Sequence, residues 1–195
     1  MKTIGLIGGM SYSSTIIYYE QLNKLSNEYF GNLTTPKIIL TSVNFSLIET
    51  LQHDGNWDEL GHVLNKEAKR LEQAGADVLA LCTNTMHKVS DTMLQNISIP
   101  FFHIAESTAK QIINDGYKKP ALLATKFTME EEFYVSKLAQ YGLSPLIPSE
   151  NSREILHSVI YDELCFNVTS ATSRDKFVDI AIEVQNNGAD SVILG

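Results

Sequence analysis

The chain of 195 residues has few of the features that indicate an extracellular, membrane-bound or nucleic-acid-binding protein. Its only two cysteines, Cys82 and Cys165, lie in unrelated contexts, which excludes a disulfide framework and favours a reducing, cytoplasmic location. The N-terminal apolar stretch is too short for a signal peptide, and no segment is long enough to span a membrane. The 15 Lys and Arg residues are scattered against 23 Asp and Glu, which argues against nucleic acid as a partner.

Motifs for metal ions and nucleotide phosphates are also missing. The histidines outside the Cys82 region show no H-x-x-x-H or C-x-x-C spacing, so no metal ion is expected; they are His53, His62, His103 and His157. The loop from Gly8 to Thr15 contains neither G-x-G-x-x-G nor G-x-x-x-x-G-K-[ST] and has no lysine. A loop of backbone N–H groups and hydroxyls suits one carboxylate better than a triphosphate. A helix is expected to begin there, capped by Ser13 or Ser14.

The remaining sequence alternates short β-branched runs with amphipathic stretches, which predicts an α/β fold with mostly parallel sheets. The clearest helix is expected from Asn56 to Ala74, and Gly75 is placed to end it. Strands are expected at residues 3–7, 37–43, 77–82, 100–103, 121–124, 144–147 and 191–194.

The two halves of the chain resemble each other. The run from Gly75 to Cys82 reads like the run from Gly188 to Gly195, and each follows a strand and a small-residue loop about seventy residues upstream. This recurrence predicts internal duplication into two similar α/β/α lobes, residues 1–99 with Cys82 and residues 100–195. A small ligand is expected in the crevice between the lobes. The residue after Gly195 is expected, to within one position, where Cys82 lies in the first lobe.

Cys82 is the first candidate for chemistry, because it ends a buried strand and is followed by Thr83, Asn84 and Thr85. A buried cysteine at such a place is more often a small hydrophobic residue than a reactive one. Here the free N–H groups of a helix start could lower the thiol pKa from about 8.5 and could hold a substrate carboxylate. His87 is interpreted as a structural residue, either beside the site or on the helix surface.

The second half offers hydroxyl donors at the matching place. Thr125 and Thr128 follow the strand expected at residues 121–124. The acidic run at residues 130–132 is interpreted as a solvated first helical turn. Cys165 is interpreted as a core residue on the apolar face of a helix.

Four segments, taken together, resemble the aspartate/glutamate racemase family. The match extends over the whole chain in order and spacing, and its most specific part is the cysteine motif with Thr-Asn-Thr. Gly8-Gly9 stands where glutamate racemases have Asp-Ser, which favours the aspartate racemase branch. The segments are Gly5-Leu6-Ile7-Gly8-Gly9-Met10-Ser11, Cys82-Thr83-Asn84-Thr85-Met86-His87, Leu122-Leu123-Ala124-Thr125-Lys126-Phe127-Thr128 and Val192-Ile193-Leu194-Gly195.

The resemblance implies racemisation of a free amino acid (aspartate, glutamate or a broader set) by a homodimer that uses neither pyridoxal phosphate nor a metal. Cys82 would be one of two cysteines that exchange the α-proton from opposite faces. The second cysteine would follow Gly195, so these residues are expected to be part of a longer chain and to hold one catalytic thiol. The implied substrate-binding residues are Gly9, Met10, Ser11, Thr83, Asn84, Thr85, Thr125 and Thr128.

The chain departs from the family where a basic residue would hold a side-chain carboxylate. The matching places are Cys165 and the stretch at residues 44–48, and neither supplies a cation. A substrate with a neutral or variable side chain is therefore credible. The candidate substitutes for the missing basic residue are Lys126, Arg153 and Arg174.

The alternatives to an amino acid racemase are a hydantoin racemase, a maleate isomerase, a decarboxylase, or a non-catalytic amino-acid-binding protein.

Overall fold

The computed structural model describes residues 1–195 and divides into two compact units, Met1–His103 (unit 1) and Ile104–Gly195 (unit 2). The boundary expected between residues 99 and 100 lies slightly N-terminal of this division. The reason is that Phe101 and Phe102 form a strand that pairs with the sheet of unit 1.

Unit 1 is built on a four-stranded parallel sheet in the order β2-β1-β3-β4. Its strands are β1 (Thr3–Gly8), β2 (Lys37–Ser42), β3 (Val78–Leu81) and β4 (Phe101–Phe102). The central strands β1 and β3 are mostly buried, as expected for strands covered on both faces, whereas every residue of the edge strand β2 is exposed or half-buried. The carboxyl ends of β1 and β3 are neighbours, since Ile7 is paired with Leu81.

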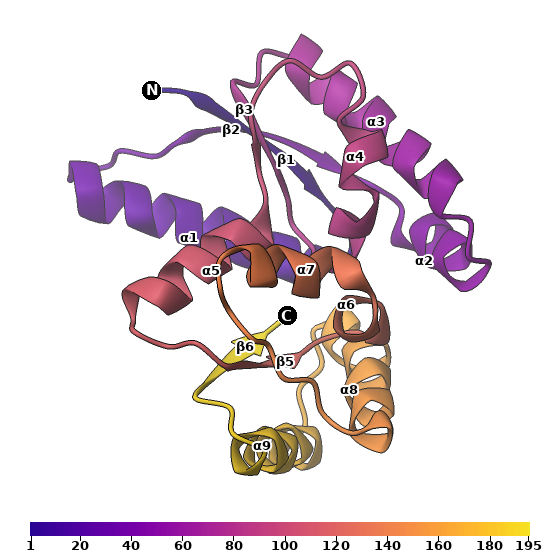
Figure 1. Cartoon of the computed structure of the whole chain (residues 1–195). Helices are drawn as coiled ribbons and strands as arrows, with labels where there is room; N and C mark the ends of the chain where they lie inside the picture. The colour runs from indigo at the N-terminus through magenta and orange to yellow at the C-terminus, as the bar shows by residue number, and fades with distance from the viewer. The chain divides into compact units, whose positions relative to one another are not determined.

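The helices of unit 1 cover both faces of this sheet, with α1 on one side and α2 and α3 on the other (Figure 1). They are α1 (Tyr12–Phe30), α2 (Phe45–His53), α3 (Trp57–Gln73), the 3₁₀ helix η1 (Thr85–Val89) and α4 (Ser90–Met93). The helix predicted from Asn56 is confirmed as α3: the Asn56 side chain accepts from the N–H of Glu59, and Gly75 ends the helix with φ +93°. The core of unit 1 joins α3 to η1 and α4.

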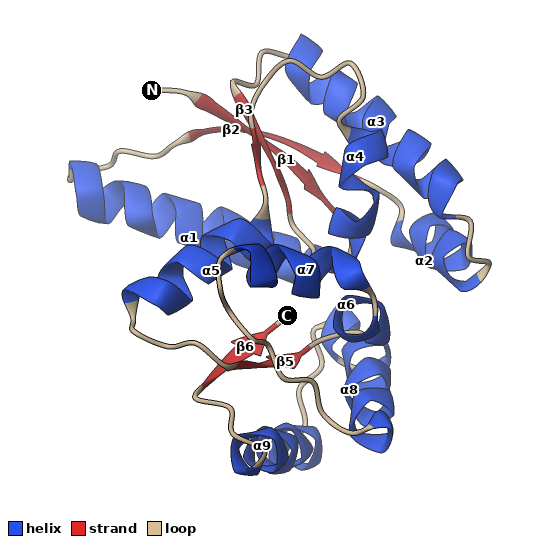
Figure 2. Cartoon of the chain, viewed as in Figure 1, coloured by secondary structure: helices blue, strands red, loops and turns tan.

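Unit 2 contains a parallel strand pair, β5 (Pro120–Leu123) and β6 (Ser191–Leu194), flanked by helices (Figure 2). The strand predicted at residues 144–147 is wrong. Only Leu146 pairs with β5, through an isolated bridge to Ala121. The prolines on either side, Pro145 and Pro148, have no N–H to donate and cannot extend the ladder.

The helices of unit 2 are α5 (Ile104–Asn114), α6 (Lys126–Glu130), α7 (Glu132–Gln140), α8 (Glu150–Asp162), the 3₁₀ helix η2 (Leu164–Phe166) and α9 (Ala171–Asn186). The prediction for Cys165 is wrong, because this half-buried residue lies in η2, outside the hydrophobic core. Residues 130–132 do not form one helical turn, because α6 ends at Glu130 and α7 begins at Glu132. None of the helices could cross a lipid bilayer.

The duplicated runs fold alike. Gly75 and Gly188 both adopt left-handed backbone conformations, with φ +93° and +101°. The carboxylate of Asp77 accepts a backbone N–H at the start of β1 at 2.6 Å, and that of Asp190 accepts one just before β5 at 3.0 Å. Each aspartate therefore joins its strand to the neighbouring one, and the chemistry of the repeat explains why both copies contain Gly-Ala-Asp.

The repeat also fixes the counterpart of Cys82. The Cys82 N–H donates to the Ile7 carbonyl at 2.9 Å, and the Gly195 N–H donates to the Leu123 carbonyl at 2.9 Å. Gly195 itself thus stands in the place of Cys82, which lies within the one-position range of the sequence prediction.

Candidate functional site

Cys82 lies directly after β3, in the centre of the sheet of unit 1, and its side chain is 0% exposed. Its backbone N–H donates to Ile7 in β1, as described above. Its carbonyl accepts a hydrogen bond from the Ser14 hydroxyl at 2.9 Å. Both backbone polar groups of this cysteine are therefore held, one by the sheet and one by α1.

The loop after β1 is packed closely against β2. Gly9 has φ +90°, and a Cβ placed on it would lie 2.6 Å from the Val43 carbonyl oxygen, so only glycine fits. Thr15 holds the loop from the helix side, because its hydroxyl accepts from the Gly9 N–H and donates to the Ser11 carbonyl, both at 2.9 Å. Gly9, Met10 and Ser11 are accordingly buried beside the strand end that precedes Cys82.

The serines at the start of α1 do not cap it as predicted. The N-cap is Ser11, whose side chain makes no capping hydrogen bond. The Ser13 hydroxyl instead pairs with that of Ser11, and the Ser14 hydroxyl lies 3.0 Å from the Ser11 carbonyl and 2.9 Å from that of Cys82. Sequence reasoning did not assign Ser14 or Thr15 to the site; the run of hydroxyl residues directly after the loop was the available signal.

The segment after Cys82 forms the short helix η1 and not a regular α-helix. Thr83 and Asn84 are half-buried and Thr85 is buried. The Asn84 side-chain oxygen is buried and has no hydrogen-bond partner. An unpaired buried acceptor costs about 1–3 kcal/mol, which makes Asn84 the strongest candidate in this segment for binding a ligand with N–H donors.

The environment of the thiol differs from the prediction. Burial raises the pKa of Cys82 to about 12, whereas a helix start was expected to lower it. The physical reason is that a five-residue 3₁₀ helix provides little positive charge at its N-terminus, while the surrounding core removes the solvent that a thiolate needs. Cys82 therefore carries its proton at neutral pH.

His87 is buried, with 1% of its surface exposed, so the placement on a helix surface is wrong. Its Nδ1 lies 2.9 Å from the Thr83 carbonyl, and its ring lies 4.5 Å from that of His103. Burial and, to a smaller extent, the charge of His103 lower the pKa of His87 to about 3, although the backbone hydrogen bonds oppose the shift. His87 is thus neutral and donates from Nδ1 to the backbone next to Cys82, which is a structural contact.

In unit 2 the two threonines of the prediction stand at the start of α6. The Thr125 hydroxyl accepts from the Thr128 N–H at 3.3 Å and lies 3.1 Å from the Thr128 hydroxyl. Both residues are buried. The Thr125 hydroxyl therefore caps α6, and the role of both threonines in substrate binding stays a prediction.

The model of the Asp/Glu/hydantoin racemase family matches residues 7–195. The chain belongs to this family. The resemblance noted in the sequence is thereby confirmed, and with it the α/β fold with parallel sheets.

Two solved structures and one curated relative that are similar to this chain agree with the family assignment. A crystal structure of a protein assigned as an Asp/Glu racemase from Yersinia pestis is 41% identical, with a TM-score of 0.88, and the match covers 98% of this chain and 84% of that one. An aspartate racemase homologue from Pyrococcus horikoshii is 34% identical, with a TM-score of 0.82, and the match covers 100% and 85%. The broad specificity amino-acid racemase RacX of Bacillus subtilis is 28% identical over 144 residues, which span 71% of this chain and 61% of that protein.

No group of His, Cys, Asp and Glu residues is arranged to hold a metal ion. Cys165 supplies no charge. The three candidate cations for a side-chain carboxylate are each paired with a carboxylate of the protein. The pairs are Lys126 with Glu154 at 3.0 Å, Arg153 with Glu130 at 2.8 Å, and Arg174 with Asp175 at 3.1 Å.

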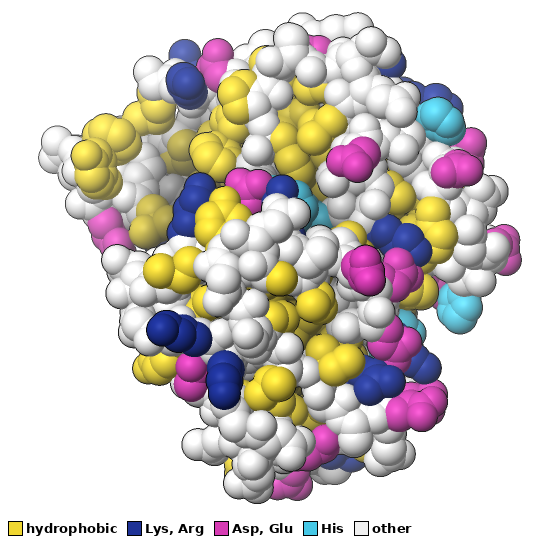
Figure 3. Space-filling model, in the orientation of Figure 1, with side chains coloured by type: hydrophobic (Ala, Val, Ile, Leu, Met, Phe, Trp, Pro, Cys, Tyr) yellow, Lys and Arg dark blue, Asp and Glu magenta, His cyan; other side chains and the backbone are white.

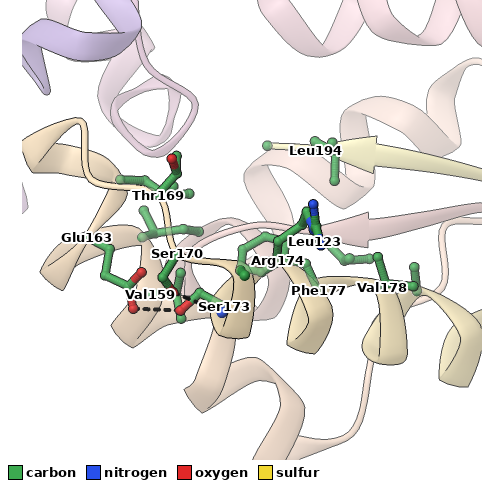
Figure 4. Close-up of a pocket in the computed structure, with 15 residues that line it drawn as sticks. Leu123, Val159, Glu163, Thr169, Ser170, Ser173, Arg174, Phe177, Val178 and Leu194 are labelled. Atoms are coloured by element: carbon green, nitrogen blue, oxygen red, sulfur yellow. Dashed lines mark hydrogen bonds between the residues drawn. The ribbon is translucent and has the colours of Figure 1, made fainter.

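A cavity of about 670 Å³ lies in unit 2 among α8, α9 and the ends of β5 and β6 (Figure 4). Its walls are mainly apolar and include Leu123, Phe177 and Leu194. At one side the Glu163 carboxylate accepts from the Ser173 hydroxyl at 2.6 Å. The volume would admit a small molecule.

The internal repeat gives this cavity another explanation. With Gly188 matched to Gly75, Phe177 of α9 is the counterpart of Leu64 of α3, and Arg174 is the counterpart of Gly61. In unit 1 this side of α3 packs in one core with residues of η1 and α4; a Cβ on Gly61 would lie 2.6 Å from that of Thr92. The cavity thus corresponds to the space that η1 and α4 fill in unit 1, and its size is no argument for a substrate site.

Proposed function

We propose that the protein is a cofactor-independent racemase of a free amino acid and that Cys82 exchanges the α-proton. The observation that carries the proposal is the place of Cys82: a fully buried thiol at the end of the central strand β3, with its backbone held from both sides. Membership of a family of racemases, and the names of the relatives above, support the same reaction class.

The reaction requires two proton transfers at one carbon. Cys82, as thiolate, removes the α-proton from one face, and a second acid, as thiol, delivers a proton to the other face; the reverse reaction exchanges their roles. The resemblance places the second thiol after Gly195. Because the pKa of Cys82 is about 12, its thiolate needs a nearby positive charge, which the α-ammonium group of the substrate supplies.

Asn84 and the loop after β1 are the proposed holders of the substrate. The unpaired Asn84 side-chain oxygen can accept a hydrogen bond from the α-ammonium group. Gly9, Met10, Ser11, Thr83, Thr85, Thr125 and Thr128 complete the proposed set. Substitution of Asn84 by Leu should raise KM about tenfold or more, because it removes the acceptor and leaves a bound N–H unpaired.

The proposed substrates have neutral or variable side chains. Each candidate cation has a carboxylate partner, so an acidic side chain would have to displace that partner. The broad specificity in the name of the Bacillus subtilis relative supports this preference. Activity restricted to aspartate and glutamate across a panel of amino acids would contradict it.

The decisive experiment is α-proton exchange in heavy water, followed by NMR with a panel of L- and D-amino acids. The Cys82→Ser variant should lose at least about a hundredfold in exchange rate, because serine is a far weaker acid than a thiol. The matched control is Cys165→Ser, which removes the other cysteine and should leave the rate unchanged. Exchange that persists in Cys82→Ser would refute the proposal.

A second function, binding of an amino acid without turnover, is favoured by the raised pKa of Cys82, which keeps the thiol protonated at neutral pH. Calorimetric binding of an amino acid to a protein that exchanges no α-proton would establish it in place of the racemase.

The homodimer is also part of the proposal. Hydrophobic side chains lie on the surface around the C-terminal end of α1 (Figure 3), where Tyr29 is 83% exposed. Such a patch is typical of a protein–protein contact. Light scattering should give the mass of a dimer, and Tyr29→Lys together with Leu25→Lys should shift it toward a monomer; a monomeric native protein would contradict this part.

A further inference from the structure

We propose that Ser14 is a positioning residue for Cys82, which holds the backbone of the cysteine so that its thiol points in one fixed direction. This inference rests on the racemase function proposed above. It assigns a role to a residue of α1 that touches no reacting atom.

The hydroxyl of Ser14 connects two segments that are far apart in the sequence. It lies 2.9 Å from the Cys82 carbonyl and 3.0 Å from the Ser11 carbonyl. A hydroxyl has one proton to donate, so the two carbonyls share it. The strand end that carries the thiol and the loop after β1 are thus joined through one side chain.

The backbone of Cys82 has only two hydrogen-bonding groups, and the sheet satisfies just one of them. The N–H donates to Ile7 at 2.9 Å, but the carbonyl points out of the ladder because β3 ends at Leu81. Without Ser14 a buried carbonyl loses its partner, and the peptide that follows Cys82 is free to turn. The direction of the side chain at Cys82 depends on this peptide.

Ser14 is itself held in place by its neighbour Thr15. The Thr15 hydroxyl bridges the Gly9 N–H and the Ser11 carbonyl at 2.9 Å each. A Cβ on Gly8 would lie 2.5 Å from the Thr15 side chain, so loop and helix are in close contact. The first turn of α1 therefore has one position relative to the loop, which makes the Ser14 contact a fixed feature of unit 1.

The expected consequence is a loss of rate without a loss of affinity. A displacement of about 1 Å at a reacting group can reduce a rate a hundredfold. The Ser14 hydroxyl contacts the proposed substrate-holding loop only at the Ser11 carbonyl, and the Thr15 hydroxyl holds this same carbonyl at 2.9 Å, so the loop keeps its place without Ser14. Ser14→Ala should therefore lower kcat for α-proton exchange about tenfold to a hundredfold and leave KM within about twofold.

Two further variants separate positioning from general stability. Ser14→Thr keeps the hydroxyl and should retain kcat within about threefold of the native value. Thr50→Ala is the matched control: its hydroxyl also donates to a backbone carbonyl, that of Ser46 at 2.9 Å, but on α2 away from Cys82. It should leave both kcat and KM unchanged, while urea unfolding measures the stability of each variant.

A second readout does not depend on turnover. In a Cys165→Ser background, alkylation of Cys82 by iodoacetamide is measured as a function of pH for the native side chain and for Ser14→Ala. A freed backbone should expose the thiol and raise its alkylation rate severalfold at pH 8, with the increase absent in Ser14→Thr and Thr50→Ala.

The outcomes distinguish this inference from the function on which it rests. If Cys82→Ser abolishes exchange but Ser14→Ala behaves like Thr50→Ala, the positioning role is wrong and the racemase stands. A Ser14→Thr variant that is as slow as Ser14→Ala would also overturn it. If no variant or native protein exchanges an α-proton, the racemase fails, and unchanged alkylation in Ser14→Ala would then overturn the positioning role as well.

Discussion

The two copies of the repeat place different chemistry on the same backbone. At the end of β3 stands Cys82, and the adjoining end of β1 carries Gly8, which has no side chain. At the end of β6 stands Gly195, and a Cβ there would lie 2.9 Å from the Cβ of Ala124. In unit 1 the larger residue of the neighbouring pair, Cys82, follows β3. In unit 2 the larger residue, Ala124, follows β5, which is the counterpart of β1. The duplicated fold supplies a strand end, and the residue on it decides whether that end can carry a proton.

The copies also differ in what covers the helix that precedes the repeated Gly-Ala-Asp run, which is α3 in unit 1 and α9 in unit 2. The inner side of α3 shares a core with Met86, Val89 and Met93, which are all buried. The matching side of α9 lines the cavity described above. Side chains on this side of the helix are therefore packed in a core in unit 1 and face a cavity in unit 2.

The largest effect is expected from making unit 1 resemble unit 2 at the strand end. Cys82→Gly gives β3 the residue that Gly195 gives β6 and removes the proposed base. Exchange of the α-proton should fall at least about a thousandfold, which corresponds to about 4 kcal/mol of activation free energy. The NMR exchange assay measures it, with circular dichroism to verify folding. A variant that keeps its activity would mean that the thiol is only a packing residue.

The next effect tests the packing difference. Leu64→Ala removes a fully buried side chain from the core of unit 1 and should lower the free energy of unfolding by about 3 kcal/mol. Phe177→Ala, at the matching place of α9, removes a side chain that faces the cavity and should cost clearly less, in spite of its larger size. Urea unfolding compares the two. Equal losses would show that the cavity is closed in solution.

The sequence was sufficient for most of the fold, because the determining signals are local. Gly75 and Asn56 mark the ends of α3 by their own backbone and side-chain chemistry, and the Gly-Ala-Asp repeat predicts the strand that follows each copy. The strand predicted around Leu146 failed since β-propensity could not weigh the missing N–H groups of its two flanking prolines.

The site was harder to predict, because its properties arise from residues distant in the sequence. The contact between Ser14 and the Cys82 carbonyl joins residues 68 positions apart. The pKa of the thiol depends on how much solvent the surrounding core excludes, and this outweighed the helix start that the local pattern suggested. The sequence identified Cys82 as the candidate, but neither its protonation state nor its supporting hydroxyl.

A pH-dependent effect should follow from His87. Its pKa is lowered from 6.5 to about 3, so below pH 6.5 the unfolded chain binds a proton that the folded chain does not. The contribution of His87 to stability is therefore complete above pH 6.5 and is lost as the pH falls toward 3, with a slope of up to about 1.4 kcal/mol per pH unit. Unfolding measured from pH 7 to pH 4 should show a shallower slope in His87→Gln. An unchanged slope would assign the acid lability to other groups.

The smallest effect is expected where the two copies are most alike. Asp77 and Asp190 both accept backbone N–H groups from the neighbouring strand, and both side chains are exposed to solvent. Asp77→Ala and Asp190→Ala should each lower the Tm of their unit by only about 2–4 °C, because each loses a strand contact that water can partly replace. Amide hydrogen exchange resolved by unit can locate each loss. A much larger effect at Asp77 than at Asp190 would show that the repeat, though matched in geometry, has taken on a special role beside Cys82.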